Sequence, residues 1–271
     1  MIWSVVSKEE MLHCNSNPVF NYYKEALGKD NIKLGIVDET CNIDFVGKRD
    51  IVLLRTGSYA LARRIKKSGV RSTAEEPDLY ELAADKKKVS CLLRQSGILV
   101  PNNYRMEDIR EGESYFVKPR YGAENKGISD RCICRSINEV HKQCSYMISE
   151  LNEEPIIEDF IEGTECTVSC FMDSGVFNYA AIAIIDGCCE PLPESEARQL
   201  GSICSDIFKI IGIRHHSRIG FRRDLNGNFY AIDINLIPSL GPTGLFARSL
   251  LVIKNYSYKQ AIEAVLNSAT V

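Results

Sequence analysis

One hairpin signal constrains the fold of this chain more than any other feature. In the segment SRIGFRRDLNGNFYAIDIN, the dipeptide Asn226-Gly227 separates two runs in which apolar and polar residues alternate. This pattern predicts a β-hairpin with a two-residue type I′ turn, in which Leu225 pairs with Asn228. Because side chains alternate along a strand, one face of the hairpin is apolar and packs into a core. The opposite face carries four polar side chains: Arg218, Arg222, Asp233 and Asn235.

The polar face of this hairpin suits magnesium and phosphate chemistry. The oxygen atoms of Asp233 and Asn235 are the kind of ligand that Mg²⁺ prefers, and a guanidinium beside them would hold a phosphoryl oxygen or a developing oxyanion. The same register places Gly220 opposite Asp233. A solvated hairpin face with incidental charges explains the pattern equally well, so the hairpin alone does not distinguish a magnesium-phosphate site from an ordinary surface.

A second segment, FVKPRYGAENKG, combines a strand with a glycine-containing loop. Lys118 lies at the end of the predicted strand, and Gly122 and Gly127 follow it. Glycines allow backbone N–H groups to approach phosphate oxygens, and the lysine supplies a positive charge. The segment is neither a Walker loop nor a dinucleotide fingerprint, and a simple hairpin loop is the alternative.

A third segment, PIIEDFIEGTECTVSCF, places two carboxylates around an apolar hinge. A nucleotide base would hydrogen-bond to the backbone between Asp159 and Ile161, with Glu158 accepting from its amino group and Glu165 from ribose hydroxyls. Two glutamates that face water on either side of a turn are the alternative.

The composition excludes several classes of protein. The chain has 271 residues, 45% of them hydrophobic and 25% charged, which is typical of globular proteins. Its 33 basic and 36 acidic residues give a net charge of -3, which favours neither nucleic acid nor an anionic membrane. No apolar window approaches the ~20 residues of a membrane helix, and we expect a cytoplasmic protein. The eleven cysteines are expected to be reduced and mostly buried.

The order of predicted elements indicates an α/β part followed by α+β parts. We predict an α/β domain over residues 1–84, a small lobe with the glycine loop over 85–150, and a larger lobe with the hairpin over 151–271. His215 and His216 precede the hairpin and are expected to be structural or solvent-facing, because adjacent strand residues point to opposite faces. Arg55, Ser58 and Tyr59 follow a predicted strand and either reach a substrate cleft or simply start a helix.

The three segments, together with the preceding DKKKVSCLLRQSGILVP, resemble the ATP-grasp superfamily, in particular D-alanine:D-alanine ligases and ribosomal-protein glutamate ligases. The resemblance covers about residues 80–245. It implies two α+β lobes that sandwich ATP, preceded by a small truncated α/β preATP-grasp domain. It also implies an ATP-dependent carboxylate-amine ligase whose substrates are a small-molecule carboxylate and an amine. No nucleic acid or membrane partner is expected, and the protein could form a homodimer.

The resemblance also implies roles for individual residues. Lys86 and Lys118 would contact the phosphates of ATP, and Arg218 would steady the transferring phosphate. One or two Mg²⁺ ions would be held by Asp233 and Asn235. The loop over the phosphates would be formed by Tyr121, Gly122, Ala123 and Gly127, and the base and ribose would be contacted by Glu158, Asp159, Phe160, Ile161, Glu165 and Ile232.

Three departures from the pattern bear on the substrate and the metal. Gly220 stands where a second carboxylate ligand is usual, AIIDGCCEPLP is shorter than the substrate-covering loop of D-alanine:D-alanine ligases, and Gly244 replaces a serine. These departures argue against cell-wall dipeptide synthesis. They also leave open a nucleotide-binding protein without ligase activity that signals through a partner. We expect Lys118→Ala and Asp233→Ala to abolish ATP turnover and to leave the fold largely intact.

Overall fold

The computed structural model describes residues 1–8, 16–38, 40–122 and 127–271. Contacts divide the chain into two compact units. The first comprises residues 1–81, 166–219 and 234–271, and the second comprises 82–165 and 220–233. The three-part division expected from the sequence remains a prediction about domains.

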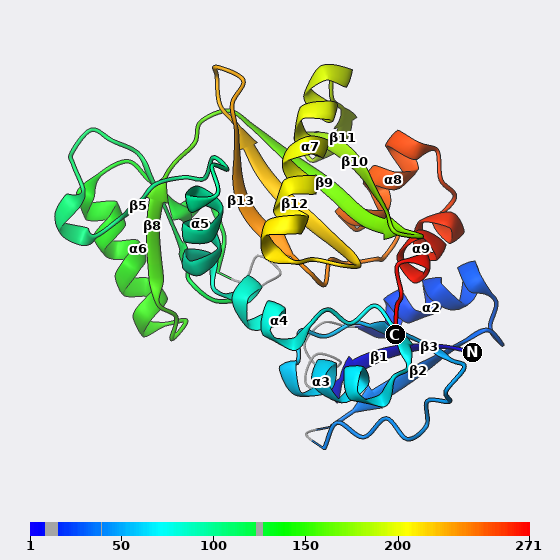
Figure 1. The fold of residues 1–271 in the computed structure, drawn as a ribbon. Coiled ribbons are helices and arrows are strands. Elements are labelled where there is room, and N and C mark those ends of the chain that lie inside the picture. The colour runs from blue at the N-terminus through cyan, green and yellow to red at the C-terminus, as the bar shows by residue number, and fades with distance from the viewer. Residues whose placement is uncertain (9–15, 39, 123–126) are drawn as a thin grey trace. The chain divides into compact units, whose positions relative to one another are not determined.

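The first unit contains a parallel four-stranded sheet near the N-terminus. The helix α3 (Tyr59–Ser68) connects two of its strands, and Ser58 caps this helix by accepting from the Leu61 N–H. The apolar face of α3 is buried, because Leu61 and Ile65 are 0% exposed. The strand order is β2 (Ile32–Val37), β1 (Ile2–Ser7), β3 (Ile51–Leu54) and β4 (Arg71–Ser72) (Figure 1).

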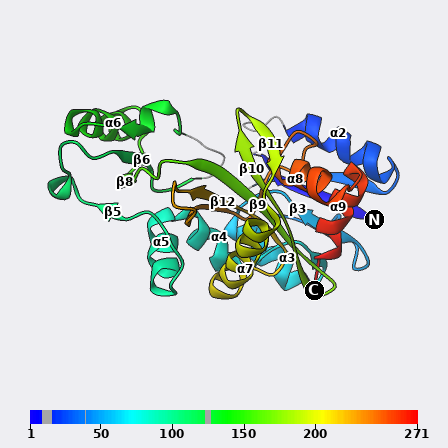
Figure 2. The same cartoon turned by 90° about the horizontal axis from the view of Figure 1, so that it is seen from above.

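A second, five-stranded sheet carries the predicted hairpin at one edge. Its order is β11 (Cys188–Pro191), β10 (Val176–Ile185), β9 (Thr164–Asp173), β12 (His216–Arg223) and β13 (Phe229–Asn235). Residues 220–233 of the hairpin group with the second unit. The helices of the first unit that pack beside this sheet or on each other are α7 (Glu194–Ile211), α8 (Leu245–Lys254), α9 (Tyr258–Asn267) and α2 (Ser16–Leu27) (Figures 1 and 2).

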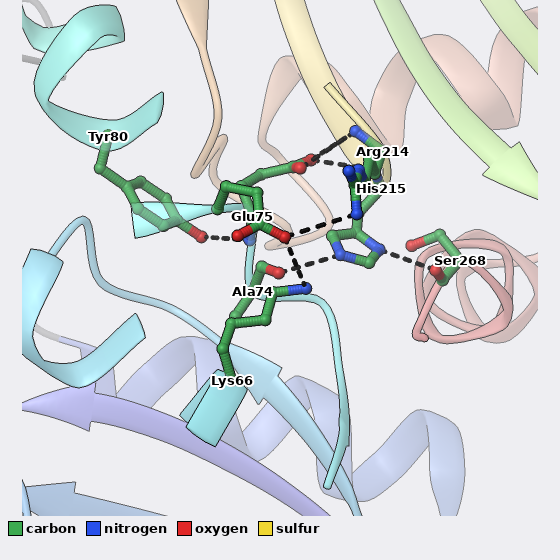
Figure 3. Close-up of polar contacts among 8 residues, drawn as sticks. Lys66, Ala74, Glu75, Tyr80, Arg214, His215 and Ser268 are labelled. Carbon is green, nitrogen blue, oxygen red and sulfur yellow. Dashed lines mark hydrogen bonds and ion pairs between the residues drawn. The ribbon is translucent and has the colours of Figure 1, made fainter. Parts of the chain in front are cut away.

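A buried polar cluster joins three distant segments of the first unit (Figure 3). The Glu75 carboxylate accepts from the backbone N–H groups of Arg214, at 3.0 Å, and His215, at 2.9 Å. The His215 ring contacts the carbonyl oxygens of Ser268, at 2.7 Å, and Ala74, at 3.0 Å. Segments that lie far apart in the sequence are therefore held together by groups that water does not reach.

The second unit is built on an antiparallel four-stranded sheet with a separate core. The core includes Tyr115, Val117, Cys144 and Met147. The strand order is β5 (Asn103–Tyr104), β8 (Pro155–Asp159), β6 (Tyr115–Pro119) and β7 (Ile133–Cys134). The other elements of this unit are α5 (Lys86–Gln95), α6 (Ile137–Ser149), η1 (Met106–Asp108) and η2 (Asp130–Cys132). The helix α4 (Pro77–Ala84) begins in the first unit and ends in the second.

The predicted type I′ turn at Asn226-Gly227 is wrong, although the hairpin itself is confirmed. The Asp224 N–H donates to the Asn228 carbonyl at 2.9 Å, so Asn228 is bonded to Asp224 and not to Leu225. The Asp224 carboxylate accepts from the N–H groups of Asn226, at 2.9 Å, and Asn228, at 2.7 Å. These bonds stabilise a longer loop in which Gly227 takes a positive φ, of 87°.

Several smaller expectations can also be compared with the structure. The two histidines are both buried, at 0% and 1% exposure, so the solvent-facing alternative is wrong. The cysteines that the structure describes are free thiols, and most of them are buried. In the described part of the chain, no helix is long and apolar enough to cross a membrane.

Candidate functional site

The second unit contains a cavity of about 400 Å³, a volume in the range of small-molecule sites. Its walls combine apolar side chains with both signs of charge. They come from the start of α5, the sheet, the hinge after β8 and the end of the β12–β13 hairpin. The residues that line it are Lys86, Pro101, Phe116, Lys118, Gly122, Ile128, Ser129, Asp130, Ile133, Glu158, Asp159, Phe160, Ile161, Glu165, Arg222, Ile232 and Asp233.

Two lysines supply positive charge on one side of the cavity. Lys118 lies on β6, and its Nζ donates to the Ile232 carbonyl at 3.0 Å. Lys86 begins α5, and its Nζ donates to the Gly122 carbonyl at 2.7 Å. Burial lowers the pKa of Lys86, while the nearby Asp233 carboxylate raises it. Both lysines are therefore held by the protein at a partly desolvated site that suits a polyanion.

Glu158 forms a buried ion pair with one of these lysines. The distance between Lys118 Nζ and Glu158 Oε2 is 2.7 Å, and the two side chains are 7% and 4% exposed. The pair arises because β6 and β8 are antiparallel neighbours, with Lys118 opposite Ile156 and Phe116 opposite Glu158. Charge at this point of the cavity is thus balanced within the protein.

The hinge after β8 forms another wall and is fixed by an arginine. Arg222 donates to the carbonyl oxygens of Ile161, at 3.0 Å, and Gly163, at 2.8 Å. Its guanidinium also lies 5.7 Å from the centre of the Phe160 ring. The Phe160 N–H donates to the Ser114 carbonyl, so this N–H is already used within the protein.

The metal site expected at the hairpin has one clear carboxylate donor. Asp233 lines the cavity, and a Cβ built on Gly220 would lie 3.5 Å from the Asp233 Cβ, so the expected adjacency of these two residues is confirmed. In the described ranges, no group of three or more His, Cys, Asp or Glu side chains is arranged to hold a metal ion. A single carboxylate fits Mg²⁺ that is bound mainly through substrate phosphates and water.

Several predicted residues lie in the cavity wall together, namely Lys86, Lys118, Gly122, Glu158, Asp159, Phe160, Ile161, Glu165, Ile232 and Asp233. Tyr121 is exposed and lies under the Arg120 guanidinium, 4.9 Å from the ring centre. Gly127 takes a positive φ of 75°. Ala123 lies outside the described residues.

The remaining two predicted residues belong to the first unit. Arg218 NH1 donates to the Thr167 hydroxyl at 3.4 Å. The Asn235 side-chain oxygen accepts from the Ile237 N–H at 2.9 Å. Their expected roles at the phosphate and the metal remain proposals.

The sequence interpretation missed several residues of the cavity wall. Phe116 shares a strand face with Lys118, so the period of two would have identified it. Arg222 stands on the predicted polar face of the hairpin, but no local signal connects it with the hinge. The residues Pro101, Ile128, Ser129, Asp130 and Ile133 become neighbours only through the fold of the second unit.

Arg55, considered for a substrate cleft, has contacts within the first unit. Its NH2 donates to the Pro238 carbonyl at 2.5 Å, and the Tyr23 side chain hydrogen-bonds to it. Ser58 and Tyr59 cap and begin α3, in agreement with the alternative that they start a helix.

Comparison with known proteins identifies the architecture. The family described as "ATP-grasp domain" matches residues 83–235, which is more than half of the chain. Among solved structures, the D-alanine–D-alanine ligase from Bacillus anthracis complexed with ATP superimposes with a TM-score of 0.78 at 19% identity, over 98% of this chain and 96% of that chain. The VanG D-Ala:D-Ser ligase from Enterococcus faecalis gives a TM-score of 0.75 at 13% identity, over 98% and 97%. At these identities the likeness shows the fold.

Several curated relatives are named D-alanine–D-alanine ligase. A D-alanine–D-alanine ligase from Chromohalobacter salexigens is 27% identical over 59% of this chain and 57% of its own length. One from Mannheimia succiniciproducens is 24% identical over 58% of this chain and 54% of its own length. The match to these relatives thus spans somewhat more than half of their length.

Proposed function

Because the chain belongs to the ATP-grasp family and has the ATP-grasp fold, we propose that it is an ATP-dependent carboxylate-amine ligase that forms an amide or peptide bond. The observation that carries the proposal is the convergence of Lys86, Lys118 and Asp233 on one cavity whose other walls include apolar side chains such as Phe116 and Ile232. Two cations and an acidic metal ligand suit a triphosphate with Mg²⁺, and the apolar walls suit a base.

The hinge supports binding of the base in a particular way. Since the Phe160 N–H already donates to Ser114, the donor for the base in this proposal is the Ile161 N–H. Glu165 is exposed at the cavity and is proposed for the ribose hydroxyls. The Glu158 carboxylate already binds Lys118, so in this proposal it accepts from Lys118 and from the amino group of adenine at the same time.

The proposed reaction has two steps. A carboxylate oxygen attacks the γ-phosphorus of ATP, the bond to the ADP oxygen breaks, and an acyl phosphate forms. An amine nitrogen then attacks the acyl carbon, inorganic phosphate leaves with the bonding electrons, and the proton that the nitrogen loses passes to the departing phosphate or to solvent. The lysines hold the phosphates, Arg218 is proposed to stabilise the transferring phosphoryl group, and Asp233 with Asn235 would hold Mg²⁺, which neutralises phosphate charge.

We further propose that the substrates are an amino acid, a small peptide or a related metabolite, and differ from those of cell-wall dipeptide synthesis. The support is the connection between β10 and β11, a tight turn in which Asp186 and Gly187 take positive φ of 51° and 76°. Such a turn is too short to cover a substrate.

Use of ATP favours a cytoplasmic location.

The test is release of ADP and phosphate by the purified protein with Mg²⁺ and a panel of amino acids and dipeptides that includes D-alanine. We expect release that requires both a carboxylate and an amine. Tight binding of ATP with no release on any mixture would contradict the ligase proposal.

A further inference from the structure

Arg120 lies immediately after β6, two residues beyond Lys118, and binds two neighbouring segments. Its Nε and NH2 donate to the two carboxylate oxygens of Asp85 at 2.9 and 2.7 Å. Its NH1 donates to Glu154, at 3.1 Å from each oxygen. Its backbone adds two bonds, since its N–H donates to the Glu154 carbonyl at 2.7 Å and its carbonyl accepts from the Lys86 N–H at 3.1 Å.

The carboxylate held by this arginine controls the start of α5. Asp85 is the N-cap of the helix and accepts from the Lys88 N–H at 3.2 Å. It is only 1% exposed, and the hydrogen bonds from Arg120 hold the pKa of its carboxyl below the ordinary value. Lys86, the next residue, is the first of the helix and lines the cavity.

These contacts connect the two lysines of the cavity through a rigid bridge. We propose that Arg120 is a positioning residue, which fixes the start of α5 against the end of β6 and so sets the spacing of Lys86 and Lys118 for the phosphates of the nucleotide. The inference rests on the proposed function. It extends that function to a residue that is not part of the cavity wall.

The bridge opposes a physical tendency of the site. Two ammonium groups at a partly desolvated site repel each other, and fixed backbone positions add to the side-chain bonds that keep them close before a polyanion arrives. Phosphoryl transfer is sensitive to such placement, because a displacement of about 1 Å can lower the rate by a factor of about 100.

The bonds require an arginine and not only a positive charge. A guanidinium presents parallel N–H groups that match both oxygens of a carboxylate, whereas a lysine is a point charge with no such fork. The bond to Glu154 contributes less to holding Arg120 in place, because the Glu154 side chain is 51% exposed and its charge is screened by water. The buried Asp85 is therefore the partner that matters.

The test compares Arg120→Lys with wild type in binding and turnover. We expect the Kd for adenosine to change by less than about 2-fold, because the base end of the cavity is untouched. The Kd for ATP should rise several-fold, and kcat should fall by about 10-fold to 100-fold. Arg198→Lys is the matched control, because Arg198 makes an exposed pair with Glu194 on α7 and should behave as wild type.

The possible results separate this inference from simpler explanations. Equal losses of adenosine and ATP affinity together with a lower Tm would show that Arg120 is only structural, and wild-type kinetics would overturn the inference as well. If Arg120→Lys does not fold, Asp85→Asn tests the same fork, because asparagine keeps the N-cap acceptor; an unchanged kcat in that variant overturns the inference. Failure of wild type to bind ATP would refute the proposed function itself, before any variant is measured.

Discussion

At the scale of single residues, Lys118 serves both the cavity and the stability of the second unit. Its buried ion pair with Glu158 means that neither charge can lose its partner without cost. The expectation that Lys118→Ala leaves the fold largely intact must therefore be revised. Asp233 is only half-buried, so the corresponding expectation for Asp233→Ala stands as a prediction.

We predict that Lys118→Ala abolishes ATP turnover and also lowers the free energy of unfolding by about 3 kcal/mol, because the Glu158 carboxylate is left buried and unpaired. The double variant Lys118→Met with Glu158→Gln should recover most of the stability and none of the turnover. Urea unfolding and ADP release measure the two effects separately. A stable Lys118→Ala variant would show that water reaches Glu158 and that the pair has little energetic weight.

A second prediction concerns the missing carboxylate at Gly220. A Cβ there would meet Asp233 and Ile232 atoms only at ordinary contact distances of 3.5 and 3.6 Å, so a Cβ fits without a clash. Gly220→Asp should lower the Mg²⁺ concentration that gives half-maximal turnover, because a second carboxylate would face the metal site. Gly220→Asn is the control of equal size. An identical Mg²⁺ dependence in all three proteins would mean that the metal does not bind at this position.

At the scale of elements, the hinge after β8 depends on the close approach of the hairpin. Gly163 takes a φ of 138°, and a Cβ on it would lie 2.0 Å from the Arg223 carbonyl oxygen. No side chain can therefore be added unless the two segments move apart. Arg222 reinforces the same contact through its bond to the Gly163 carbonyl.

We predict that Gly163→Ala destabilises the protein more than Gly175→Ala does. Gly175 also has a positive φ, of 83°, but no described atom lies within 4 Å of the position that a Cβ would take there. Gly175→Ala should therefore cost only the backbone strain of about 1 kcal/mol, whereas Gly163→Ala adds a steric clash. The midpoints of urea unfolding measure the difference, and equal midpoints would contradict a tight contact. Gly163→Ala should also raise the KM for ATP, because the hinge forms a wall of the cavity.

At the scale of the whole molecule, the first unit is assembled from three separate stretches of chain, and Glu75 lies where they meet (Figure 3). Burial raises the pKa of Glu75 to about 7, although the N–H groups of His215 and Arg214 oppose the shift. Burial lowers the pKa of His215, so the histidine affects stability in the opposite direction. The contribution of the Glu75 carboxyl group to the pH dependence of stability can therefore be separated from that of His215 only by comparing variants.

The sign of the effect of Glu75 follows from its raised pKa. Between the ordinary value of 4.5 and about 7, the folded state holds a proton that the unfolded state has released, so this group's contribution to stability falls as the pH rises. We predict that Glu75→Gln becomes more stable relative to wild type across this window, by at most about 1.4 kcal/mol per pH unit. Glu76→Gln, at a neighbouring side chain that is 48% exposed, is the control and should show no such trend. Parallel stability curves for wild type and Glu75→Gln would contradict the shift.

Much of the local structure, and most of the side chains that line the cavity, could be predicted from the sequence. Ser58 and Tyr59 start α3, which was one of the two alternatives drawn from the sequence, because helix ends depend on nearby residues. The motifs around Lys118, Glu158 and Asp233 predicted side chains that line one cavity, since each motif needs only a strand with its adjoining loop. The family resemblance, confirmed over residues 83–235, then supplied the order in which the motifs belong together.

How these residues are neutralised and held depends largely on contacts that form only in the folded chain. The Lys118–Glu158 pair depends on the register of β6 and β8, and the fork between Arg120 and Asp85 joins residues 35 positions apart. The hairpin loop was misjudged because the Asp224 carboxylate satisfies backbone N–H groups that a type I′ turn would arrange differently. The first two cases share a physical reason: a hydrogen bond or ion pair needs its two partners within a few ångströms, and packing brings together residues that lie far apart in the chain. The hairpin loop is a local case, in which a side-chain carboxylate competes for nearby backbone N–H groups.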